Sequence, residues 1–121
     1  MVKINLKNKV IPIDFGEFQL EFSKSDENLN KMREFGKDLE KKGQEIVKED
    51  GKEDMDKVRE LLRLAYDGVF GEGSFDKVYE LSGHSTIDTL NYFFEVLSGI
   101  EEEQVSNENK KLIERYIGKQ K

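Results

Sequence analysis

The chain has 121 residues, close to the commonest size of a single domain. It has no cysteine, which excludes disulfides, thiolate nucleophiles and thiolate metal sites. A formal net charge of −6 at pH 7, with no basic patch to offset it, argues against nucleic-acid binding because the phosphates would repel the protein. No apolar run approaches the ~20 residues that span a bilayer, and the amino-terminal stretch alternates instead of forming a signal peptide's apolar block.

The first 22 residues have the pattern of a small sheet. Apolar and polar residues alternate at 2–6 and again at 18–22, which is the period of a half-buried strand. A turn is expected at Asn8-Lys9. The apolar stretch 10–13 holds the only proline, Pro12, which fits an edge strand because it has no N–H to donate to a neighbouring strand. We therefore predict an antiparallel hairpin or meander over residues 1–22, covered by a helix.

The period changes to that of a helix at residue 25. Ser25 is the predicted N-cap, and two acidic residues follow in the first turn, where the helix dipole favours anions. Gly36 and Gly43 lie inside the apolar stripe of this helix. Either they let another element approach closely, or they only loosen the helix, at a cost of ~1 kcal/mol each relative to alanine. The stripe consists of Leu29, Met32, Phe35, Leu39, Ile46 and Val47.

Further helices are predicted at 54–70, at 74–81 with Ser74 as cap, and from Ser85 or Thr86 to Ile100. The last of these is apolar over more than half its circumference, so it should contact neighbours on several sides and be the central helix. A final helix with Leu112, Ile113, Tyr116 and Ile117 either docks on the core or is free until a partner arrives. The prediction is one α+β, mainly helical domain over 1–121, with the hairpin or meander packed on four to five helices in 25–118.

Three segments contain residue types that active sites or ligand sites use, but none of them predicts a catalytic, cofactor or metal site. His84, in a Ser-Gly-His-Ser turn, lacks the nucleophile elbow of a serine hydrolase and is predicted to be an exposed turn residue. Gly71-Glu72-Gly73-Ser74 lacks the lysine of a phosphate loop and is predicted to end a helix. The acidic segment 50–56 places Lys52 at a position where a calcium loop needs an oxygen ligand. We therefore expect a protein that is not an enzyme.

The order of segments resembles a known group of proteins. A strand pair near VIPIDFGEFQLEF precedes the charged helix SDENLNKMREFGKDLEKKGQEI; AYDGVFGEGSFDKVY and the apolar helix STIDTLNYFFEVLSGI follow. Over about residues 10–100 this is similar to small proteins of the tail gene clusters of phages and prophages of Gram-positive bacteria. These in turn resemble the tail assembly chaperones of long-tailed phages.

The resemblance implies a protein of the host bacterial cytoplasm that binds tail components before assembly. The implied partners are the tape-measure protein, the tail-tube protein, or both, and self-association into a homo-oligomer is also expected. A tape-measure protein is largely amphipathic helix, whose apolar stripe a groove would protect. The candidate protein-binding residues are Phe35, Leu39 and Ile46 on the first helix and Tyr92 and Val96 on the apolar one, each of which could instead belong to the core.

Three other functions remain open at this point. A structural virion protein, such as a head–tail connector or tail-completion subunit, would remain in the finished particle. An acidic mimic of DNA would space its carboxylates along one face. An enzyme would need a deep pocket that converges on His84 or on a pair of carboxylates.

Overall fold

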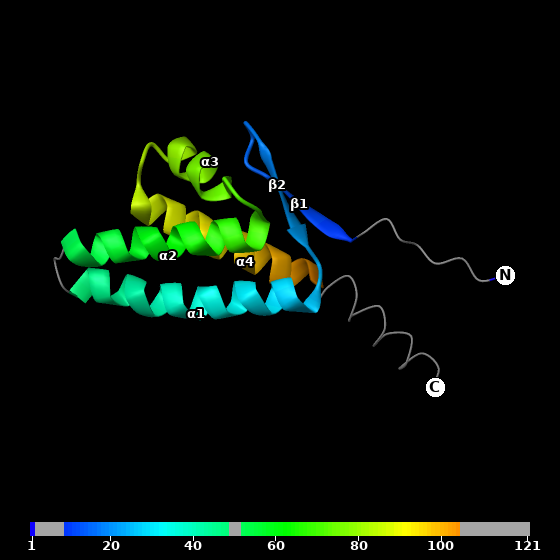
Figure 1. The fold of residues 1–121 in the computed structure, drawn as a ribbon, viewed down its shortest axis with the longest axis horizontal. Coiled ribbons are helices and arrows are strands. Elements are labelled where there is room, and N and C mark those ends of the chain that lie inside the picture. Colours follow the sequence, from blue (N-terminus) through cyan, green and yellow to red (C-terminus); the bar gives the residue numbers. More distant parts are fainter. Residues whose placement is uncertain (2–8, 49–51, 105–121) are drawn as a thin grey trace.

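The computed structural model describes residues 1, 9–48 and 52–104, and the side chains of all of these except 45–48, 52–54 and 104. The elements of this part are β1 (Val10–Asp14), β2 (Gln19–Ser23), α1 (Asp26–Lys48), α2 (Lys52–Phe70), α3 (Ser74–Leu81) and α4 (Thr86–Gln104). An antiparallel hairpin therefore precedes four helices, as Figure 1 shows. The predicted mainly helical α+β class is confirmed. The strand predicted at 2–6 and the helix predicted near 112–117 lie outside the described residues.

The hairpin separates apolar from polar side chains. β1 pairs with β2 from Val10 opposite Ser23 to Asp14 opposite Gln19. Ile11, Leu20 and Phe22 point inward and are buried, whereas the residues between them on each strand are exposed. This period-two pattern buries one face of the sheet, as the alternation in the sequence predicts.

Pro12 lies where the predicted edge strand can tolerate it. The N–H of Phe15 donates to the carbonyl of Phe18 at 3.0 Å, and the N–H of Lys24 donates to the carbonyl of Lys9 at 3.0 Å. Because hydrogen-bonded pairs alternate along an antiparallel ladder, the backbone groups of Pro12 point away from β2. The missing N–H therefore costs the hairpin no hydrogen bond.

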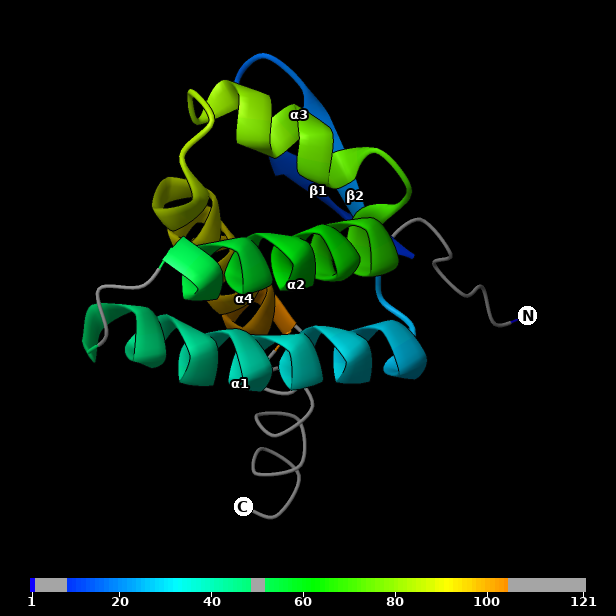
Figure 2. The ribbon, with the colours of Figure 1, turned by 60° about the vertical axis from the view of Figure 1, so that its left-hand side comes forward.

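The other three described helices pack against α2. α2 contacts α1, α3, α4 and β2, and Figures 1 and 2 show it between α1 on one side and α3 on the other. α4 crosses behind this pair and packs on α1, α2 and α3. α4 thus contacts neighbours on several sides, as predicted, but α2 is the central helix. The physical reason is its uninterrupted buried stripe, which consists of Val58, Leu62, Ala65, Tyr66 and Val69.

The glycines of α1 permit close packing against α4. A Cβ atom added to Gly36 would lie 2.6 Å from Cδ1 of Leu97, and one added to Gly43 would lie 3.3 Å from Cδ2 of Leu90. Both distances are shorter than ordinary van der Waals contacts between carbons. The glycines therefore admit side chains of α4 and do more than loosen α1.

Two helix starts differ in their details from the predictions. Ser25 caps α1 as predicted, because its Oγ accepts a hydrogen bond from the N–H of Asn28 at 3.1 Å. Ser74, predicted to cap α3, is instead the first residue of that helix and donates from Oγ to the carbonyl of Gly71 at 2.7 Å. The N–H of Phe75 donates a hydrogen bond to Oδ1 of Asp67 at 3.0 Å. A residue of α2 therefore provides the acceptor for a backbone N–H in the first turn of α3.

Candidate functional site: a groove between β1 and α4

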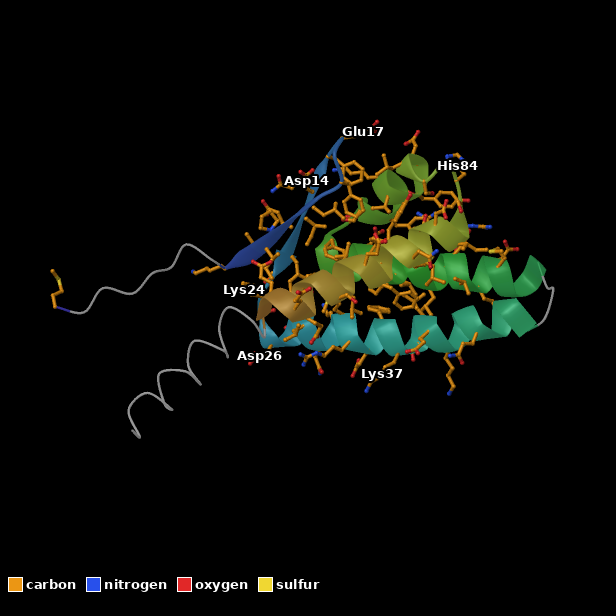
Figure 3. The ribbon with its side chains drawn as sticks, turned by 180° about the vertical axis from the view of Figure 1, so that it is seen from behind. Asp14, Glu17, Lys24, Asp26, Lys37 and His84 are labelled. Atoms are coloured by element: carbon orange, nitrogen blue, oxygen red, sulfur yellow. The ribbon has the colours of Figure 1, made fainter. Side chains whose placement is uncertain are left out.

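A groove of about 540 Å³ runs between β1 and α4. Figure 3 shows the molecule from behind, with α4 on the near side and the hairpin that carries the labelled Asp14 lying beside it. β1 and the residue that follows it form one wall, the exposed side of α4 forms the other, and the last residue of α3 closes one end. We refer to this feature as the β1–α4 groove.

Apolar side chains form the floor of the β1–α4 groove and part of its walls. Ile11 and Ile100 are 5% and 1% exposed and form its floor, whereas Ile13, Tyr92 and Val96 are partly exposed along its walls. The partly exposed side chains give an approaching molecule an apolar surface to contact. Such a surface gains binding free energy from burial at about 25 cal/mol per Å² of apolar area.

Gly99 makes the groove deeper than another residue would. A Cβ atom added at this position would meet no atom within 4 Å, so the space beside the backbone of α4 is open. The residue is exposed, and its neighbour in the chain Ile100 is buried in the core. The absence of a side chain at Gly99 therefore belongs to the shape of the groove and not to the packing of the core.

The charged side chains among the described residues that line the groove are all acidic. They are Asp14 on β1 and Glu95 and Glu103 on α4. Among the described residues, no lysine or arginine lines the groove to neutralise them. The groove therefore combines an apolar surface with a negative rim, and it favours a ligand that is apolar on one face and positively charged at its edges.

The structure places the five predicted protein-binding residues in different environments. Tyr92 and Val96 line the β1–α4 groove. Phe35 is partly buried and lines a smaller depression between α1 and α2, next to Gly68. The side chain of Ile46 lies outside the described residues.

The prediction for Leu39 needs correction, because this residue is 0% exposed. Leu39 faces the core from the middle of α1 and offers no surface to a partner. Periodicity identifies the apolar side of a helix, but it does not tell which turns of that side another element covers.

Sequence reasoning did not find the contribution of the hairpin to this site. Ile13, Phe15 and Asp14 on the hairpin side, and Gly99 on α4, were not among the predicted binding residues, although all four line the groove. The alternation at 10–15 indicates which side chains share a face. It does not indicate that this strand lies beside α4, which follows it by more than 70 residues.

The turn around His84 is structural. His84 is exposed, has a φ of 62°, and stacks on Tyr79 with ring centroids 5.0 Å apart. Ser82 Oγ donates to the carbonyl of Tyr79 at 2.6 Å and accepts from the N–H of Ser85 at 3.0 Å. These bonds hold the serine in the turn between α3 and α4 and leave no hydrogen bond between His84 and Ser82 among those of the described residues.

The glycine-rich segment after α2 ends that helix, as predicted. Gly71 and Gly73 have φ values of 110° and 88°, and the N–H of Gly71 bonds the carbonyl of Asp67 at 3.1 Å. Because the Asp67 carboxylate already bonds the start of α3, a phosphate would meet a negative charge there. In the described residues no group of histidine, cysteine, aspartate or glutamate side chains is arranged to hold a metal ion.

None of the helices in the described part of the chain is long and apolar enough to cross a membrane. No curated protein and no solved structure matches the chain. A family model described as a family of unknown function (DUF6673) matches residues 16–121, from the hairpin turn onward. Since this match covers most of the sequence, the chain belongs to the family of unknown function DUF6673.

Proposed function

We propose that this protein is a non-catalytic tail assembly chaperone of a phage or prophage, acting in the cytoplasm of the host bacterium. Its partners would be the tape-measure protein, the tail-tube protein, or both, bound before the tail assembles. The proposal rests on the resemblance in segment order and on the β1–α4 groove. The groove is the observation that carries it, because it offers a protein ligand an accessible apolar surface.

The shape and charge of the groove suit a helix of a partner. Tyr92 and Val96 lie one turn apart on α4, and Ile13 lies opposite them on β1. A partner helix that presents apolar residues three and four positions apart would contact both walls at once. Lysine or arginine at the edges of that stripe would lie near Asp14, Glu95 and Glu103, which steers association and fixes orientation.

Co-expression tests the proposal. The protein is produced together with the tape-measure protein, and separately with the tail-tube protein, of the same tail gene cluster, and the soluble fraction is separated by size-exclusion chromatography. We expect a defined complex that keeps the partner soluble. A partner that stays insoluble, with this protein eluting alone in both pairings, would contradict the proposal, and presence of this protein in purified virions would favour a structural virion component.

Variants connect that complex to the groove. Tyr92→Ala should weaken binding about tenfold or more, since buried aromatic anchors commonly cost more than about 1.4 kcal/mol when truncated. Gly99→Leu should weaken it as well, because the Cβ of the new side chain has open space on the groove side of α4 and the rest of the side chain would take up room that the partner needs. Leu64→Ala is the matched control: Leu64 is 61% exposed on α2 and does not line the groove.

A further inference from the structure

The β1–α4 groove begins where the described part of the chain ends. Glu103, one of its acidic lining residues, is followed immediately by Gln104, the last residue of α4. Residues 105–121 therefore start at the mouth of the groove. The family match that includes α1 to α4 continues through residue 121, so this segment belongs to the same family unit as the helices.

The composition of residues 105–121 complements the groove. The segment carries five basic residues, Lys110, Lys111, Arg115, Lys119 and Lys121, against the two acidic residues Glu108 and Glu114. This basic excess occurs in a chain with a formal net charge of −6. The groove carries the opposite charge, because the charged side chains that line it within the described part of the chain are those of Asp14, Glu95 and Glu103.

The apolar residues of the segment have the spacing of one helix face. Leu112 and Tyr116 are four residues apart, and so are Ile113 and Ile117. The stretch 110–117 and the wall of α4 from Val96 to Glu103 each comprise eight residues, so a helix over 110–117 and that wall would both be about 12 Å long at a rise of 1.5 Å per residue. The two lengths match.

The connection between α4 and this stretch is of the right length to reverse the chain. Residues 105–109 include Ser106, Asn107 and Asn109, which are residue types that favour turns. Antiparallel helices in bundles are joined by about 2–8 residues. A helix over 110–117 could therefore return along α4 and meet Gly99 and Val96.

We propose that residues 105–121 dock as a basic amphipathic helix in the β1–α4 groove of the same chain. The segment would cover Tyr92 and Val96, place its lysines and arginine beside the acidic rim, and compete with a partner for the same surface. In this last respect the inference rests on the proposed function. Tethering at the end of α4 gives the segment an effective concentration in the millimolar range, so weak contacts are enough for docking.

Paramagnetic NMR on the full chain tests docking without any partner. Because the chain has no cysteine, Lys119→Cys provides a single attachment point for a nitroxide. The methyl groups of Ile13 and Val96 report on the groove, and those of the exposed Leu64 on α2 serve as the reference. We expect the groove methyl signals to lose intensity near the nitroxide and the Leu64 signals to keep it.

Two variants separate docking from mere tethering. Gly99→Leu places a side chain in the groove where the segment would lie, so in this background the loss of intensity at Ile13 and Val96 should disappear. Glu95→Lys with Glu103→Lys reverses most of the rim charge and should also reduce it. The same loss of intensity in wild type and Gly99→Leu would overturn the proposal, because proximity would then come from the tether alone.

Two further samples identify other occupants. In a mixture of nitroxide-labelled chain and isotope-labelled chain without nitroxide, loss of intensity at the groove would assign the occupant to a second copy and overturn the intramolecular proposal. The second sample carries the nitroxide at Lys3→Cys. If this nitroxide reduces the methyl signals of the groove and the one at Lys119→Cys does not, the occupant is the amino-terminal segment, and the proposal for residues 105–121 is overturned. A failure of docking leaves complex formation with tail components unaffected, so the two proposals fail separately.

Discussion

The side-chain amide of Asn28 donates a hydrogen bond to the carbonyl oxygen of Val69 at 3.1 Å, joining the first turn of α1 to the last turn of α2. The carbonyls of a final helical turn have no partner within the helix, so Asn28 satisfies an acceptor that would otherwise be buried without one. The same nitrogen donates to the carbonyl of Ser23 at 3.0 Å, at the end of β2. Asn28, 8% exposed, thereby connects three elements.

Asn28→Ala should lower the free energy of unfolding by about 2–3 kcal/mol, because two hydrogen bonds are lost and the Val69 carbonyl remains buried. Asn28→Asp should cost at least as much, since it removes the donor and puts a negative charge near two carbonyl oxygens. Urea unfolding followed by circular dichroism measures both. Asn91→Ala, at an exposed position of α4, is the control and should change stability by no more than about 0.5 kcal/mol. Equal stability of Asn28→Ala and Asn91→Ala would show that the connection contributes nothing.

Gly36 and Gly99 form a matched pair of helical glycines. Gly36→Leu should destabilise the protein by about 1–3 kcal/mol, because Leu97 occupies the space that a side chain at residue 36 needs. Gly99→Leu should leave stability unchanged or raise it by up to about 1 kcal/mol, since a Cβ atom at this position has open space around it and leucine favours helix. Thermal unfolding of the two variants is the measurement. A Gly99→Leu protein as unstable as Gly36→Leu would disprove the open side of the groove.

The pH dependence of stability should carry a signature of Tyr66. This residue is 0% exposed, and its Oη donates to the carbonyl of Thr89 at 2.8 Å. Burial, with smaller effects of Tyr92 and Glu95, raises the pKa of Tyr66 far above its usual value. The phenol therefore keeps its proton in the folded state when it would lose it in the unfolded state, whose tyrosine pKa is about 10.

The stability provided by protonated Tyr66 is fully present below pH 10 and decreases as the pH rises above that value. The contribution of this one group falls by about 1.4 kcal/mol per pH unit. Tyr66→Phe should remove that contribution to the slope, while costing about 1 kcal/mol at neutral pH through the lost hydrogen bond. Urea unfolding between pH 8 and about pH 11.5 compares the two proteins. Parallel curves above pH 10 would mean that Tyr66 ionises in the folded state.

Asp67 provides the cap of α3 from another helix. Asp67→Ala should destabilise the protein by about 1 kcal/mol and up to about 2, because the N–H of Phe75 loses its acceptor. Asp38→Ala, an exposed aspartate on α1, is the comparison and should have little effect. Hydrogen exchange should show the loss of protection concentrated in residues 74–78. Uniform loss over the molecule would indicate that Asp67 acts on the whole fold and not as a local cap.

Local signals explain which parts of this fold can be predicted from the sequence. The alternation at 18–22, Ser25 at the start of α1 and the glycines after Phe70 act over a few residues, so the residues themselves locate the hairpin, the cap and the helix end. Relations between distant elements carry no such signal. Gly36 indicates that something approaches α1, but the identity of Leu97 follows only from how α4 crosses α1. Asp67 as the cap of α3 depends in the same way on the angle between two helices.

The candidate site, like the fold, has parts that the sequence predicts and parts that only the arrangement of distant elements explains. The broad apolar arc of α4 predicts that Tyr92 and Val96 face a second neighbour, whereas the core takes Phe93 and Ile100. Leu39 occupies an equally apolar stripe but is fully covered by other elements. The difference arises because β1 lies beside α4 without closing over it, and that placement is a property of the whole fold.

The proposed function is best tested by co-expressing the protein with the tape-measure protein that we propose as its partner and separating the soluble fraction by size-exclusion chromatography. We expect a soluble complex of defined size that forms with Leu64→Ala but is weakened about tenfold or more by Tyr92→Ala and lost or weakened by Gly99→Leu. If the tail-tube protein is the partner, the same order of variants is expected in that pairing. A complex with either protein that forms equally well with all three variants would contradict the groove as the binding surface, and no complex in either pairing would contradict the chaperone function itself.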